Sequence, residues 1–176
     1  MILRLAQLED AAALEELIQV SVRSLQAGDY SAAQMEGALG TVLGLDRQLI
    51  RDGTYFVVDA EGPIVACGGW SRRRTLFGAD RAPGKDDGWL DPAVDPARVR
   101  AFFVHPEWAR RGLGTRILEA AEAAARAAGF RRLELAATLT GIPLYAARGY
   151  SAIERVEVPL PNGEILPVVR MGKPLP

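Results

Sequence analysis

The sequence has very few side chains that could act as nucleophiles or bind a transition metal. Its 176 residues include one cysteine, Cys67, and one histidine, His105. A single cysteine cannot form an internal disulfide, and with one histidine it cannot make up a Cys/His zinc cluster. Cys67 ends the apolar run of residues 64–67, so we expect a buried, inert thiol there. No metal site is predicted.

Long apolar segments and an excess of one charge are also missing. Residues 1–6 lack the apolar stretch of a signal peptide. No segment reaches the ~18 uninterrupted apolar residues of a membrane-spanning helix. The net charge is −1, which gives no reason to expect nucleic acid or a membrane as a partner. We therefore expect a cytoplasmic protein. With 49% apolar and 24% charged residues, it is expected to form a single domain over residues 1–176.

Hydrophobic periodicity and turn residues predict alternating strands and helices. Strands are expected at residues 2–5, 54–59, 63–70, 98–104, 132–137, 150–158 and 165–171. Helices are expected from a cap at Asp10 to residue 25, and at 31–39, 115–128 and 143–148, with another before Gly53. Residues 71–96 are polar and rich in Gly, Pro and Asp, which is typical of a long loop. This order predicts a mixed α/β (α+β) sheet fold.

A glycine turn between a strand and a helix is the most informative motif. The sequence Arg-Arg-Gly-Leu-Gly-Thr at residues 110–115 follows the apolar run 99–104 and opens into the alanine-rich segment 115–128. Backbone N–H groups at a helix start are unpaired, and glycine lets a phosphate approach them closely. The turn is not a nucleoside triphosphatase loop, because no lysine follows its second glycine. The alternative is a tight turn whose glycines serve geometry and whose arginines are solvated.

A second motif follows at the right distance. Residues 99–150 contain, in order, a strand ending in Val-His-Pro, the glycine turn, a helix ending in Ala-Gly-Phe, a strand with Leu-Glu-Leu, and Gly-Ile-Pro-Leu-Tyr-Ala-Ala-Arg-Gly-Tyr. This order resembles the GNAT superfamily of acetyl-CoA-dependent N-acetyltransferases, over about a third of the chain. The resemblance implies a mostly antiparallel sheet of about seven strands flanked by helices. It also implies acetyl transfer from acetyl-CoA to a primary amine by direct attack in a ternary complex.

The resemblance also implies which residues bind the cosubstrate. The turn would bind the pyrophosphate of coenzyme A through Arg110, Arg111, Gly112, Leu113, Gly114 and Thr115. The strand before it would lie along the pantetheine arm through Phe102, Phe103 and Val104, with a backbone amide polarising the thioester carbonyl. The alternative is that these three are only buried strand residues. Thr140 stands where many relatives have an asparagine that contacts pantetheine. Ala109 replaces the Gln or Arg that usually begins the turn.

Tyr145 occupies the position of the family's usual general acid. When an amine attacks a thioester, the leaving thiolate needs a proton, and a phenol can supply one. The alternative is a buried tyrosine that only packs a short helix.

The general base is not identified by the sequence. Arg98 stands where many relatives have a glutamate at the start of the strand that leads into the turn. The remaining candidates are water, Glu134, Asp86, Asp87, Asp91 and Asp95. His105 is expected to cap or pack the corner instead of acting in catalysis.

The acceptor is not identified either, beyond a small-molecule or peptide amine. The arginines at 72–74 are expected to be solvated, with contact to a substrate carboxylate or to the 3′-phosphate of coenzyme A as the other reading. The acidic cluster at 85–87 would instead attract a cationic acceptor. Three tryptophans, Trp70, Trp89 and Trp108, are candidates for lining an acceptor pocket or filling the core.

Three other functions remain open: transfer of a longer acyl group, a non-catalytic acyl-CoA-binding or sensor domain, and a nucleotide-binding module. A homodimer is compatible with the β-rich segment 153–171, which would offer a sheet edge for pairing.

Overall fold

The computed structural model describes all residues, 1–176, and contains one seven-stranded sheet in the order β1-β2-β3-β4-β5-β7-β6. The strands are β1 (Ile2–Leu5), β2 (Tyr55–Asp59), β3 (Ile64–Ser71), β4 (Ala97–Val104), β5 (Arg132–Thr138), β6 (Ser151–Pro159) and β7 (Ile165–Pro174). All neighbouring strands are antiparallel except β4 and β5, which are parallel. The expected fold class, a mixed and mostly antiparallel sheet flanked by helices, is thereby confirmed.

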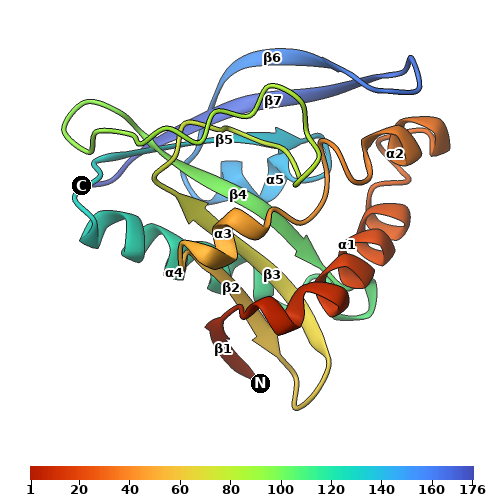
Figure 1. Ribbon diagram of the computed structural model, residues 1–176, viewed down its shortest axis with the longest axis horizontal. Coiled ribbons are helices and arrows are strands. Elements are labelled where there is room, and N and C mark those ends of the chain that lie inside the picture. Colours follow the sequence, from red (N-terminus) through yellow and green to blue (C-terminus); the bar gives the residue numbers. More distant parts are fainter.

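Helices cover both faces of the sheet (Figure 1). The helices are α1 (Ala11–Leu25), α2 (Ala32–Ala38), α3 (Arg47–Arg51), α4 (Leu113–Ala127) and α5 (Ile142–Ala147). Successive strand residues point to opposite faces, so Val57 packs with α1, α2 and α3 while its neighbour Val58 packs with α4. The sheet therefore separates two apolar layers.

Two helix starts differ from the sequence prediction. Asp10 lies at the N-cap position of α1, but its carboxylate accepts from the Gln7 N–H at 2.7 Å and pairs with Arg4 at 2.8 Å. It therefore closes the preceding turn instead of capping the helix. Helix α4 begins at Leu113, two residues before the expected Thr115, because Gly114 lies inside its first turn.

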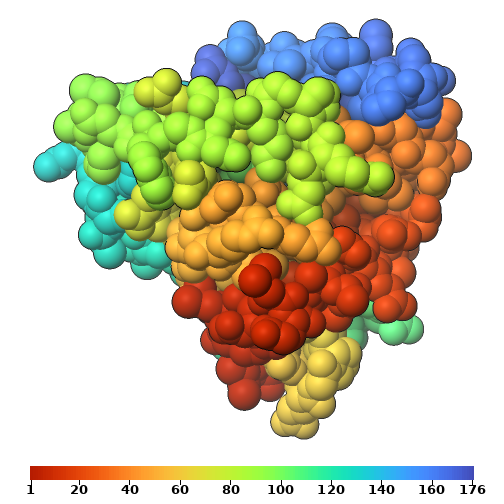
Figure 2. Space-filling view, in the orientation of Figure 1, coloured from red at the N-terminus to blue at the C-terminus, as the bar shows by residue number.

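Residues 72–96 form the expected long loop, without helices or strands. Figure 2 shows it, in yellow-green, lying across one face against the orange segment of α2 and α3. Ion pairs fasten it near its start, where Arg73 pairs with Asp52 at 2.7 Å, and near its middle, where Lys85 pairs with Asp46 at 2.9 Å. Arg73 is thus not the solvated residue that the sequence suggested.

No helix in the structure has the length and apolar character needed to span a membrane.

Candidate active site

The site begins where β4 and β5 separate. These parallel strands pair only at Ala97 with Leu133 and at Arg98 with Glu134, and then diverge. Beyond Arg98, the backbone groups of β4 that face β5 have no partner strand. A cavity of about 220 Å³ occupies the gap. It is smaller than the ~300–1,000 Å³ of a drug-sized ligand site, so it suits a small reactive group.

A bulge in β4 shapes one wall of this cavity. The register with β3 shifts between Cys67, which faces Phe103, and Gly69, which faces Arg100. Ala101 takes up the extra residue with a φ of 57°, a left-handed conformation that costs energy for a residue with a Cβ. The fully buried Tyr55 donates its hydroxyl to the carbonyl oxygen of Ala101 at 2.6 Å. This hydrogen bond fixes the strained segment.

Two neighbours of the bulge are explained by packing. Gly68 lies under the ring of Phe102, since a Cβ there would lie 2.6 Å from the ring. Cys67 is fully buried, and desolvation raises the pKa of its thiol to about 12. The expectation of a buried cysteine is confirmed.

The glycine turn forms a row of free backbone donors. No N–H of residues 110–115 donates a hydrogen bond within the protein, and the first to find an acceptor is that of Arg116, on Gly112 O at 3.0 Å. Two left-handed residues, Arg110 with a φ of 59° and Gly112 with a φ of 78°, bend the chain into this shape. The 15-residue helix α4 adds the positive end of its dipole. An anionic group therefore fits here.

The side chains of the glycine turn differ in their surroundings. Arg110 and Arg111 are exposed, and the guanidinium of Arg111 stacks 4.9 Å from the ring centre of Trp108. A Cβ on Gly114 would lie 3.2 Å from Leu144, so glycine permits α4 to approach α5 closely.

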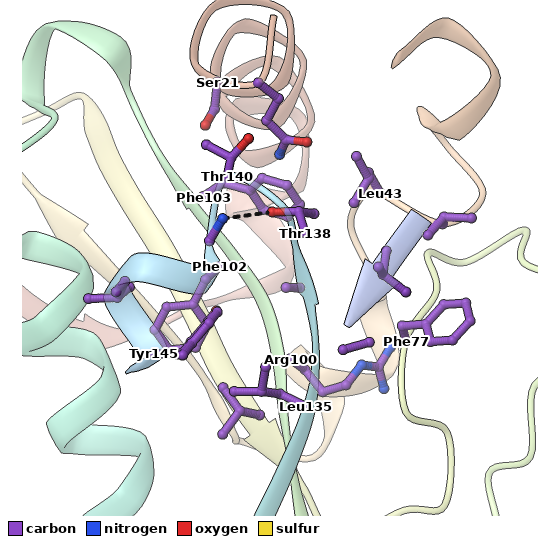
Figure 3. A pocket seen from close by; sticks show the side chains of 18 of the residues that line it. Ser21, Leu43, Phe77, Arg100, Phe102, Phe103, Leu135, Thr138, Thr140 and Tyr145 are labelled. Atoms are coloured by element: carbon purple, nitrogen blue, oxygen red, sulfur yellow. Dashed lines mark hydrogen bonds between the residues drawn. The ribbon is translucent and has the colours of Figure 1, made fainter. Parts of the chain in front are cut away.

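Tyr145 extends from α5 toward the cavity. Its ring lies 6.2 Å from that of Phe102 and 5.7 Å from that of Tyr150, both in edge-on contact, and Figure 3 shows Tyr145 beside Phe102. Burial alone raises the pKa of its hydroxyl, with no charged or hydrogen-bonding group to offset it. Tyr145 is therefore protonated at neutral pH and free to donate.

Six of the residues singled out in the sequence line this one cavity: Phe102, Phe103, Val104, Gly114, Thr140 and Tyr145. The other turn residues do not line the cavity, but they are chain neighbours of Gly114, which does. They are Arg110, Arg111, Gly112, Leu113 and Thr115. Thr140 donates its hydroxyl to Asp29 at 2.7 Å, which joins the start of α5 to the end of α1.

None of the carboxylates considered as general base lines the cavity. Glu134 is engaged instead by Arg98 at 3.4 Å and Arg170 at 3.2 Å. His105 accepts the Glu107 N–H on its Nδ1 at 3.2 Å and so caps the corner, as expected.

The three tryptophans do not line the cavity either. Trp70 belongs to the core, while Trp89 is 58% exposed under Arg73, whose guanidinium lies 4.0 Å from its ring centre.

The opposite wall was not found from the sequence. It is made by the end of α1, the segment between α2 and α3, and the long loop, through Ser21, Leu25, Gln26, Val42, Leu43, Gly44, Leu76, Phe77 and Gly78. These residues form no local motif. Arg100 was the one visible signal, as a charged residue inside an apolar strand.

Comparison with known families adds a direct result. The sequence matches the model of the acetyltransferase (GNAT) family over residues 20–150. The chain belongs to this family. No protein of curated function matches the sequence.

Solved GNAT structures share the fold along the whole chain. A GCN5-related N-acetyltransferase from Rhodopseudomonas palustris has 25% identity and a TM-score of 0.73, covering 99% of this chain and 95% of that one. PaiA N-acetyltransferase from Thermoplasma acidophilum, in complex with coenzyme A, has 14% identity and a TM-score of 0.64 over 98% of both chains. A phosphinothricin acetyltransferase from Sinorhizobium meliloti, in complex with acetyl-CoA, has 20% identity and a TM-score of 0.64, covering 99% and 88%.

Proposed function

We propose that this GNAT protein transfers an acetyl group from acetyl-CoA to a primary amine by direct attack in a ternary complex. The observation that carries the proposal is the row of free N–H groups at residues 110–115, directly beside a cavity that Tyr145 faces. A diphosphate on the turn and a thioester in the gap between β4 and β5 would then belong to one ligand.

The strand β4 supports the thioester end. Its backbone groups beyond Arg98 are not used by β5, so a pantetheine arm can pair with Phe102, Phe103 and Val104. The bulge held by Tyr55 fixes the backbone of Ala101 and Phe102, and a strand N–H there would polarise the thioester carbonyl. The hydroxyl of Thr140 donates its proton to Asp29, so its oxygen would accept from a pantetheine N–H.

Tyr145 would supply the proton. As the amine nitrogen bonds to the carbonyl carbon, the C–S bond breaks and the sulfur takes the Tyr145 hydroxyl proton. The amine loses a proton to water, which can return one to Tyr145. Burial raises the pKa of the phenol, so Tyr145 keeps its proton until negative charge develops on the sulfur. A covalent acyl-enzyme through Cys67 is disfavoured because that thiol is buried and un-ionised.

One observation favours a second function. The cavity lining contains no aspartate, glutamate, histidine or lysine, so no side chain there can take the proton of the amine. A protein that binds acyl-CoA without transferring the acyl group would need no such group.

Two measurements separate these functions. A thermal-shift titration should show acetyl-CoA and CoA stabilising the protein well above ATP, because a ligand that binds only the folded state raises its apparent stability. A thiol-release assay with acetyl-CoA and a panel of amines should then show turnover. Stabilisation by ATP without CoA would point to a nucleotide-binding module, and CoA binding without thiol release from any amine would favour the sensor.

A further inference from the structure

The cavity lining carries one charged side chain. Arg100 projects from β4 among apolar residues such as Leu43, Phe77 and Leu135, and Figure 3 shows its guanidinium beside Phe77. It is only 3% exposed. A buried cation is costly unless it is paired, so its partners decide what else it can bind.

Those partners use only part of the guanidinium. Its Nη2 donates to Asp46 Oδ2 at 3.0 Å and to Gly78 O at 2.8 Å, and its Nη1 donates to Thr75 O at 3.4 Å. A guanidinium has five N–H donors, so two remain after these three bonds.

Asp46 is shared by two cations. The same Oδ2 forms an ion pair with Lys85 Nζ at 2.9 Å, while Oδ1 accepts the Gln48 N–H at 3.0 Å. Arg100 and Lys85 carry +2 and Asp46 carries −1, so the three side chains in direct contact sum to +1, while the carboxylate of Asp87 acts on Arg100 without forming an ion pair with it. The cavity side of the cluster is therefore complementary to an anion.

Another polar group on the cavity lining, the side-chain oxygen of Gln26, has no hydrogen-bond partner in the protein. Gln26, at the end of α1, is 6% exposed, and its Oε1 is buried without a hydrogen bond in the protein. Such an oxygen needs an N–H or O–H donor from a bound molecule.

We propose that the acceptor is a small amino acid with an apolar side chain, whose carboxylate binds Arg100 and whose amine donates to Gln26 Oε1. This inference rests on the acetyltransferase function proposed above. An anion balances the positive charge of Arg100, and the volume of about 220 Å³, part of which the thioester end of acetyl-CoA would take, restricts the acceptor to a small one. Polyamines are disfavoured because they bring further positive charge beside a buried cation.

The test compares acceptors that differ only in charge. Thiol release from acetyl-CoA is measured with alanine, valine and leucine, with their amides, and with spermidine. The carboxylate raises the pKa of its own amine, so intrinsic reactivity favours the amides. We expect kcat/KM for the best amino acid to exceed that for its amide by about tenfold or more, since a charge-assisted contact is lost.

Three variants locate the effect. Arg100→Met should lower kcat/KM for that amino acid by about 10- to 100-fold and change its amide by less than about threefold. Lys85→Met neutralises the cluster without touching the cavity lining, and should lower the same value by about three- to tenfold. Arg98→Met is the matched control, because Arg98 lies two residues before Arg100 on β4 and outside the cavity. It should change kcat/KM for neither the amino acid nor its amide.

The outcomes distinguish this inference from the function beneath it. The inference would be overturned if amides or spermidine were acetylated as fast as every amino acid. It would also be overturned if Arg100→Met lowered kcat/KM equally for the amino acid and its amide. Either result would leave the acetyltransferase function unaffected. If Arg100→Met gives no thermal shift with CoA, it has not folded and Lys85→Met decides. If no amine releases thiol, the acetyltransferase proposal fails. The amino acid site then depends on whether leucine stabilises the CoA complex of the native protein but not that of Lys85→Met.

Discussion

Replacing Tyr145 with phenylalanine removes one hydroxyl and almost nothing else. The hydroxyl has no hydrogen-bonding or charged partner in the protein, and the edge-on contacts with Phe102 and Tyr150 belong to the ring. The hydroxyl faces the open cavity, where water can solvate it, so it is not a buried polar group left without a partner. The free energy of unfolding should therefore change by less than about 1 kcal/mol, which corresponds to about 2–4 °C in Tm at this chain length.

Catalysis should respond much more strongly. Loss of a general acid typically lowers the rate by about 10²–10⁴-fold, so kcat should fall in that range. The KM for acetyl-CoA and the thermal shift with CoA should remain close to those of the native protein, because the free N–H groups at residues 110–115 are untouched. The assay is thiol release at saturating amine, alongside thermal melts with and without CoA.

Tyr150→Phe provides the matched control. Its ring lies 5.7 Å from that of Tyr145, but Tyr150 does not line the cavity, so kcat should change by less than about threefold. An unchanged kcat in Tyr145→Phe would remove Tyr145 from the mechanism. A large fall in Tm together with kcat would mean that the hydroxyl has a structural partner, contrary to the reasoning above.

Three further predictions follow from the same structure. Tyr55→Phe leaves the partly buried Ala101 carbonyl without its 2.6 Å hydrogen bond, so chemical denaturation should show a loss of about 1–3 kcal/mol, and kcat should fall more than the KM for acetyl-CoA rises. Equal stability would contradict the role of this bond. Cys67, with its pKa near 12, should react with a thiol reagent at pH 8 only at the rate of unfolding, and faster labelling would show that it is accessible. The hydrogen bond from Arg73 lowers the pKa of Asp52 below its usual 3.8, so its contribution to stability is complete above about pH 4 and is lost as the pH falls through the folded-state value. Denaturation midpoints are measured from about pH 2 to 7 for the native protein and for Asp52→Asn. As the pH falls, the midpoint of Asp52→Asn should decrease less steeply than that of the native protein, and an identical decrease would show that the Asp52–Arg73 pair does not contribute.

Much of the fold was readable from local patterns. All seven strands lie where alternation and turn residues predicted them. The glycine turn and Tyr145 were found because each is a short motif whose residues are close in the chain. Errors were confined to ends, such as the start of α4, because glycine in a first helical turn resembles a loop.

Burial of charge was harder to predict. Glu122 of α4 is buried and pairs with Lys173 of β7 at 2.6 Å, although the helix pattern gave no sign of a partner so distant in sequence. Ion pairs of this kind depend on which elements pack together, and that is decided by the whole core.

The sequence by itself determined the strands, the helices, the phosphate-sized turn and the position of the candidate proton donor, since each depends on contacts between near neighbours in the chain. Only the tertiary structure decided the separation of β4 from β5, the bulge at Ala101, and the meeting of Gln26 with Arg100 around one cavity. These features depend on packing between segments far apart in sequence. For that reason the sequence could point to the acetyl donor, while the case for the acceptor rests on the assembled cavity.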